Sequence, residues 1–328
     1  MNNPEDYFDS EEFRKALHQY ESAVAAGETV FFDIDVLSDI TDYYDDIGDT
    51  ERAMAAADYA LHFNPSATLP NVYMARQALL NEDYDTARQH ADNIDEKDEP
   101  DYHYLVAEIL IAEGRLDEAD NYLKECEKNV EADEYADFMK DCANLFVDYC
   151  IFEKAYEWMK RLKGDNSLDY KQLMARTLLG LSKFKEATVV LEEMVDEDPY
   201  CVEFWNLLSA AQFMCEDHSG SLTSSEYSLA IQPNNPDGLL NKANAQYMMD
   251  NFEGALETYD RYEETGETDG AALLNKALCL FNLHKTDEAV RCLQRALCAA
   301  VNDKGLMEQI WLELSLMRRE KDNESQPL

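Results

Sequence analysis

The sequence predicts an all-α fold, a solenoid of tandem helix-turn-helix units. A pattern of small residues recurs with a period close to 34 residues, and the apolar residues between them follow helical spacing. Pro and Gly are scarce, at 8 and 11 of 328 residues. Their scarcity favours long helices over the turn-rich pattern of a β-sandwich or barrel.

The period is clearest at a small residue that follows a turn. Consecutive positions are separated by 34, 32, 36, 32, 34, 34 and 34 residues: Ala53, Ala87, Ala119, Ala155, Ala187, Ser221, Ala255 and Ala289. A second small residue stands twelve residues before each of them: Thr41, Ala75, Ala107, Ala143, Ala175, Ser209, Ala243 and Ala277. Because helices that cross closely leave no room for a large side chain, each period predicts a pair of helices, A and then B.

This register divides the chain into eight units with a cap at each end. We expect units at residues 34–67, 68–99, 100–135, 136–167, 168–201, 202–235, 236–269 and 270–303. One unit cannot bury its own apolar stripe, so the ends of an array need covering. We therefore predict an N-terminal capping helix within residues 1–33, a C-terminal capping helix at 304–320 and a frayed tail at 321–328.

Several residues of the units carry a family resemblance. Trp205, Leu208 and Ser209 stand in one predicted helix A, and Pro65 and Pro199 close their units. On these residues and the period, residues 34–303 resemble the tetratricopeptide repeat family. The resemblance implies a right-handed superhelix whose helices A line a concave groove, and a function in binding other proteins.

The resemblance also selects the residues that face this groove. In units six to eight they are apolar with amide groups, and Arg176 comes from unit five: Asn206, Phe213, Met214, Leu240, Asn241, Asn244, Tyr247, Met248, Asn275, Leu278, Phe281 and Arg176. Amides can bond both the donors and the acceptors of a peptide backbone, so we expect a peptide or helix of a partner there. Alternatively, some of these side chains pack between units and Arg176 forms an internal ion pair.

Charge limits the classes of partner. The chain has 69 acidic and 28 basic residues, a net charge of −41, and nine carboxylates with no Lys or Arg between residues 28 and 51. A field of this sign repels phosphate backbones and anionic membranes. We therefore expect no nucleic acid and no membrane as partner, but a protein that can carry basic segments; alternatively, the acidity only keeps the chain soluble.

No set of residues in the sequence predicts catalysis. The six His are isolated, the eight Cys form no CxxC pair, and no nucleophile, phosphate-binding or metal motif occurs. The sequence predicts neither an enzyme nor a cofactor or metal site. We expect the Cys to be buried thiols. The N-terminus lacks a secretion signal, which predicts a soluble, cytoplasmic protein. A homodimer formed through the C-terminal end is the alternative function.

Overall fold

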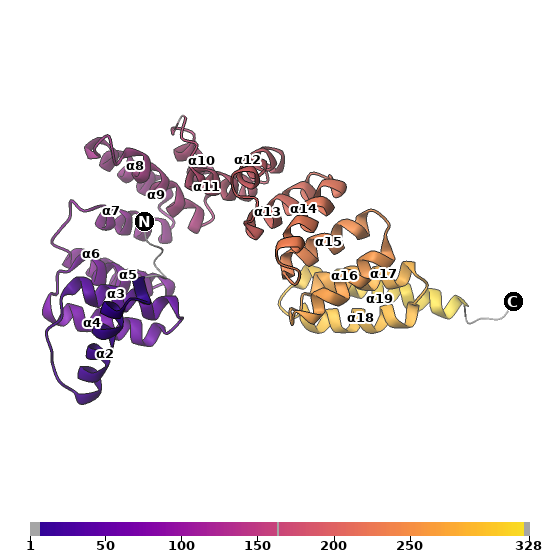
Figure 1. The fold of residues 1–328 in the computed structure, drawn as a ribbon, viewed down its shortest axis with the longest axis horizontal. Helices are drawn as coiled ribbons and strands as arrows, with labels where there is room; N and C mark the ends of the chain where they lie inside the picture. The colour runs from indigo at the N-terminus through magenta and orange to yellow at the C-terminus, as the bar shows by residue number, and fades with distance from the viewer. Residues whose placement is uncertain (1–6, 163, 325–328) are drawn as a thin grey trace. The chain divides into compact units, whose positions relative to one another are not determined.

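The computed structural model describes residues 7–162 and 164–324, and over these residues it is all-helical apart from loops and a single 3-10 turn (Figure 1). The chain divides into two compact units, unit 1 at Met1–Trp158 and unit 2 at Met159–Leu328. The prediction of an all-α array of helical repeats is confirmed.

Unit 1 begins with a single helix, which successive helix pairs follow. The helices that the structure describes are α2 (Glu11–Ala26), α3 (Ile34–Asp46), α4 (Thr50–Phe63), α5 (Thr68–Leu80), α6 (Tyr84–Asn93), α7 (Pro100–Ala112), α8 (Leu116–Cys126), the 3-10 turn η1 (Glu127–Asn129), α9 (Tyr135–Asp148) and α10 (Phe152–Met159). Helices α3 and α4, α5 and α6, and α7 and α8 pack together as pairs.

Unit 2 continues the same order and ends with a long single helix. Its helices are α11 (Leu168–Gly180), α12 (Phe184–Glu197), α13 (Val202–Met214), α14 (His218–Ile231), α15 (Pro236–Met248), α16 (Phe252–Glu264), α17 (Gly270–Asn282), α18 (Thr286–Ala299) and α19 (Lys304–Glu324). The odd-numbered helices α11 to α17 are helices A, and the even-numbered helices α12 to α18 are helices B.

The turn from helix A to helix B is the same in all eight pairs. The residue two places before each helix B has a positive φ: Gly48, Glu82, Gly114, Cys150, Ser182, Glu216, Asp250 and His284. One left-handed residue reverses the chain after helix A, and only two of the eight are Gly. Asp49, Asp83, Asp217 and Asn251 then cap their helices B with side-chain hydrogen bonds to backbone N–H groups.

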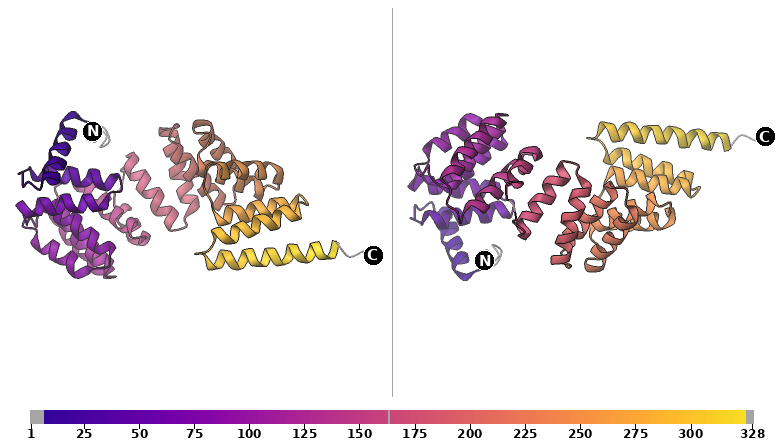
Figure 2. Two further views of the ribbon diagram at one scale, coloured as in Figure 1. Left: turned by 90° about the horizontal axis from the view of Figure 1, so that it is seen from below. Right: turned by 90° about the horizontal axis from the view of Figure 1, so that it is seen from above.

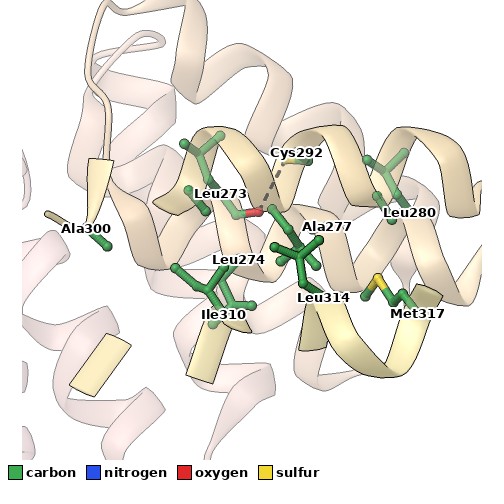
Figure 3. Close-up of a cluster of buried hydrophobic side chains, with 12 residues drawn as sticks. Leu273, Leu274, Ala277, Leu280, Cys292, Ala300, Ile310, Leu314 and Met317 are labelled. Carbon is green, nitrogen blue, oxygen red and sulfur yellow. Dashed lines mark hydrogen bonds between the residues drawn. The ribbon is translucent and has the colours of Figure 1, made fainter. Parts of the chain in front are cut away.

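The single helices at the two ends each cover an apolar face. In unit 1, Phe13 and Tyr20 of α2 are buried with Leu37 and Ile40 of α3. In unit 2, α19 contributes Ile310, Leu314 and Met317, which point into the core formed by α17 and α18 (Figure 3). Each fully buried side chain of this size stabilises the fold by about 1.5–3 kcal/mol.

The last helix is longer than the sequence analysis predicts. We expect the capping helix to end at residue 320, but α19 continues to Glu324. No Gly or Pro stands between Leu306 and Pro327, so no residue in this stretch favours an earlier end. The helix therefore extends into residues 321–324 of the predicted tail, and residues 325–328 lie outside the described part. The boundaries of the eight units remain a prediction.

Candidate functional site

The residues predicted to line a groove in unit 2 lie on four successive helices A, of which α13 contacts α15 and α15 contacts α17. Met214 on α13 and Met248 on α15 occupy equivalent positions 34 residues apart, and their exposed fractions are 55% and 49%. Arg176 on α11 is exposed, and it takes part in an interaction within the chain. The remaining predicted residues other than Asn206 are partly exposed: Phe213, Leu240, Asn241, Asn244, Tyr247, Asn275, Leu278 and Phe281.

Asn206 corrects the sequence analysis, because it is buried and its amide bonds to other residues of the fold. Its Nδ2 donates to Oδ1 of Asn235 at 2.8 Å, and its Oδ1 accepts from the Ser228 hydroxyl at 2.6 Å. Only 8% of Asn206 is exposed. The side chain therefore ties helix A of one pair to helix B and to the start of the next pair.

Asn241 continues this connection. Its Nδ2 donates to the backbone carbonyl of Asn206 at 3.1 Å, which joins α15 to α13. Its Oδ1 has no hydrogen-bond partner among the described residues. Asn241 is thus held in one orientation by one end of the amide while the other end remains unused.

Asn244 and Asn275 form a second connection, between α15 and α17. Oδ1 of Asn244 accepts from the Tyr259 hydroxyl at 2.6 Å and from Nδ2 of Asn275 at 3.2 Å. Within the described residues, neither Nδ2 of Asn244 nor Oδ1 of Asn275 has a partner. The two amides therefore leave one donor and one acceptor free for a ligand.

Phe213 and Tyr247, near the C-terminal ends of α13 and α15, pack against rings at the start of the helices B that follow. The Phe213 ring lies 5.2 Å from the His218 ring, and the Tyr247 ring lies 5.9 Å from the Phe252 ring, measured between centroids. Burial raises the pKa of the Tyr247 hydroxyl, with a smaller contribution from nearby charges. Leu278 and Phe281 pack partly against the cluster below α19. They contribute to the core as well as to the surface.

The corresponding surface of unit 1 is acidic. A hollow of about 330 Å³ is lined by Asp35 and Ser38 of α3, by Leu69 of α5, and by Glu96, Glu99 and Asp101 at or near the start of α7, among other residues. Asp35 and Asp101 stand in the first turns of their helices, where the helix dipole stabilises a carboxylate. The sequence analysis singles out the carboxylates between residues 28 and 51, of which Asp35 is one. It missed Glu96 and Glu99, because they come from the loop before α7 and not from a groove position.

Several carboxylates lie close together further along α3. Loss of hydration, followed by the charges of Asp39, Asp46 and Asp45, raises the pKa of the Asp42 carboxyl. Two tyrosines relieve part of this crowding, because the Tyr7 hydroxyl donates to Asp39 at 2.7 Å and the Tyr73 hydroxyl donates to Asp45 at 3.0 Å. The charge of Arg76 also acts against the rise in the pKa of Asp42.

The two small residues of each pair lie where its helices cross. All sixteen are buried, with Thr41 at 2% exposure and the other fifteen at 0%. In the sixth pair the two residues touch directly, because the Ser209 hydroxyl donates to the Ser221 carbonyl at 2.7 Å. Helices A and B therefore cross at the positions that the 34-residue period marks. The described helices therefore form an array of helical repeats, with the period on which the resemblance to the tetratricopeptide repeat family rests.

Comparison with known proteins gives likenesses to solved structures. No family model matches the chain, and no curated protein matches it. A tetratricopeptide repeat protein from Parabacteroides merdae is 12% identical, with 75% of this chain and 98% of that chain covered and a TM-score of 0.48. MamA is 20% identical over 51% and 92%, with a TM-score of 0.46. A thermophilic tetratricopeptide repeat protein from Thermus thermophilus is 15% identical over 54% and 97%, with a TM-score of 0.45. Likenesses at this level say nothing about a ligand.

The cysteines of this helical array differ in exposure. Four are buried as predicted: Cys126, Cys142, Cys279 and Cys292. Cys150 and Cys298 are exposed, which corrects the expectation of buried thiols; Cys150 is the left-handed residue of its turn. Among the described residues, no group of three or more His, Cys, Asp or Glu could hold a metal ion. The helices described here include none that is long and apolar enough to cross a membrane.

Proposed function

We propose that this chain is a non-catalytic scaffold that binds a peptide or helix of a partner protein on the helices A of unit 2. We call the binding region the amide–methionine surface: Met214, Asn241, Asn244, Met248 and Asn275. The observation that carries the proposal is the state of its three amides. Each is fixed by a bond within the fold, yet each keeps one polar atom unused.

The unused atoms match the chemistry of a polypeptide backbone. Oδ1 of Asn241 and of Asn275 can accept from backbone N–H groups, and Nδ2 of Asn244 can donate to a carbonyl. A side chain that is already held in place loses little entropy when it binds. These amides therefore support recognition of a main chain, independent of its sequence.

The methionines supply the apolar part of the contact. Met214 and Met248 are about half exposed and stand one repeat apart. Met side chains are flexible and polarizable, so they adapt to ligand side chains of different shapes. The surface suits a segment with apolar residues at intervals along it, in an extended strand or on one face of a helix.

The charge of the chain selects among such segments. A net charge of −41 and the acidic hollow of unit 1 favour partner segments that contain Lys or Arg. Opposite charge raises the association rate more than it raises the final affinity. We therefore assign selection and steering to the acidic residues and the main contact to the amide–methionine surface.

Selection from a random peptide library, followed by affinity measurements on the enriched peptides, tests this proposal. Changing Met214→Glu and Met248→Glu together should weaken binding by at least about thirtyfold, because two apolar contacts worth roughly 1 kcal/mol each are replaced by charge. The matched control is Val189→Glu with Ile231→Glu, which changes exposed apolar residues on the helices B α12 and α14. Equal affinity of both variants would reject the proposed surface.

A further inference from the structure

The outer face of α19 is apolar and uncovered. Ile310, Leu314 and Met317 face the α17–α18 core, whereas Leu312 and Leu316 are 58% and 46% exposed. On a helix these two residues lie opposite the three buried ones, and Ser315 between them is also exposed. Both views in Figure 2 show α19 as the last layer of unit 2, with its outer side free. Trp311, on the flank of the helix, is 55% exposed.

The charges on the same face are divided between its ends. Glu308 lies one turn before Leu312, and Arg319 lies one turn after Ser315. Both are exposed, and neither forms an ion pair within the described residues. The charge of Arg319 is therefore available to a second chain.

We propose that the outer face of α19 binds the same face of a second copy of the chain, with the two helices antiparallel. In that arrangement Leu312 of each copy meets Ser315 and Leu316 of the other, and Glu308 of each copy meets Arg319 of the other. A parallel arrangement would place Glu308 against Glu308 and Arg319 against Arg319. The charges therefore select the antiparallel pair, which has the two-fold symmetry common to homodimers.

The size of the outer face of α19 determines the expected affinity of the dimer. A few half-exposed apolar side chains and two ion pairs correspond to the small end of specific interfaces, so we expect a dissociation constant on the order of 10 μM. Long-range repulsion between two strongly acidic chains opposes the dimer, and moderate salt should strengthen it by screening that repulsion. This inference does not depend on the amide–methionine surface.

Sedimentation equilibrium of the full chain over about a hundredfold range of concentration tests the proposal. The variants reverse the charges of Glu308 and Arg319, first singly and then together. Glu308→Arg alone and Arg319→Glu alone should each weaken dimerisation by at least about tenfold, because each creates two like-charge contacts. The double variant Glu308→Arg with Arg319→Glu should restore the wild-type constant to within about threefold. Only an antiparallel pair predicts this recovery.

Two controls separate a local contact from a general effect of charge or a loss of fold. Glu257→Arg makes the same change in net charge as Glu308→Arg, at an exposed residue of α16, and should leave the dimer unchanged. Circular dichroism melting should give the same midpoint for all four variants, because the altered side chains are exposed. A wild-type chain that remains monomeric at the highest concentration, or a double variant as weak as either single one, would overturn the inference.

Discussion

The two units use one scaffold to present opposite chemistry on their helices A. In unit 1, α3 and the start of α7 present carboxylates around a hollow, and burial and like charges raise the pKa of Asp42. In unit 2, α13, α15 and α17 present methionines and half-satisfied amides. Both units bury the same small residues where their helices cross. The crossing positions therefore fix the fold, whereas other positions of helix A differ in chemistry between the two units.

The largest expected effect tests whether the scaffold is truly common to both units. Ala75→Leu on α5 and Ala243→Leu on α15 each add three carbons at a crossing that has no exposed surface. Overpacking of this kind costs about 3 kcal/mol, so both variants should lower the free energy of unfolding by similar amounts in urea titrations. Exposed Ala25→Leu on α2 is the control and should change it little. A large loss at one crossing only would show that the two units are not built alike.

The units also differ in the polar contacts that join their helices. In unit 1 the buried Asp120 carboxylate accepts from Trp158 at 3.0 Å, from Lys124 at 2.8 Å and from Lys154 at 2.9 Å. In unit 2 the Lys276 ammonium lies 2.6 Å from Asp260 and 3.0 Å from Glu263. A buried acid joins the helices of one unit, and a buried base joins those of the other.

These contacts predict opposite pH dependence. Burial alone would raise the pKa of Asp120, but bonds and charges from Lys124 and Lys154 outweigh it and hold that pKa below its usual value. Its contribution is present above the unfolded pKa of about 3.9 and is lost as pH falls through the folded value. Burial would lower the pKa of Lys276, but Asp260 and Glu263 raise it. Its contribution is present below about pH 10.4 and is lost as pH rises through the folded value.

Neutral variants separate the two contributions. Asp120→Asn should cost about 2 kcal/mol near neutral pH and little in acid, whereas Lys276→Met should cost about 1 kcal/mol near neutral pH and little in strong alkali. Denaturant titrations across pH measure both differences. Parallel curves for wild type and Asp120→Asn over the acid range would contradict the assignment of that carboxylate.

The sequence predicts the crossings more fully than it predicts the surface. Every crossing follows from two small residues, because close approach of helices has a local steric requirement. The burial of Asn206 does not follow from the sequence, because its partners Ser228 and Asn235 lie 22 and 29 residues away and their approach depends on the packing of three helices. Glu96 and Glu99 were missed for a related reason: loop residues have no place in a helical register. The unused atoms of Asn241, Asn244 and Asn275 likewise depend on tertiary hydrogen bonds that no spacing shows.

A cationic peptide tests whether the acidic surface of unit 1 binds positive charge. A short oligolysine peptide should bind the full chain at low ionic strength and dissociate as salt screens the charges. Asp35→Asn with Asp42→Asn should weaken this binding by about tenfold, while Glu51→Gln on α4 should have a smaller effect. Because burial and nearby carboxylates raise the pKa of Asp42, binding should weaken as the pH falls and this carboxyl is protonated above its usual range. Binding that is unaffected by the double variant would leave the acidic surface with a solubilising role only.

The smallest effect concerns the turns, which the two units share although their residues differ. Glu82 in unit 1 and Asp250 in unit 2 adopt φ values of 58°, whereas Gly48 and Gly114 serve the same position in other pairs. A side chain costs roughly 1–2 kcal/mol in this conformation, and Gly recovers that at an entropic cost of roughly 0.5–1 kcal/mol. Glu82→Gly and Asp250→Gly should therefore each stabilise the fold by about 0.5 kcal/mol, and Gly48→Ala should destabilise it by about 1 kcal/mol. Thermal melting of the three variants measures these shifts. Because a Cβ at Gly48 would meet no atom within 4 Å, a loss there isolates the backbone conformation from any clash.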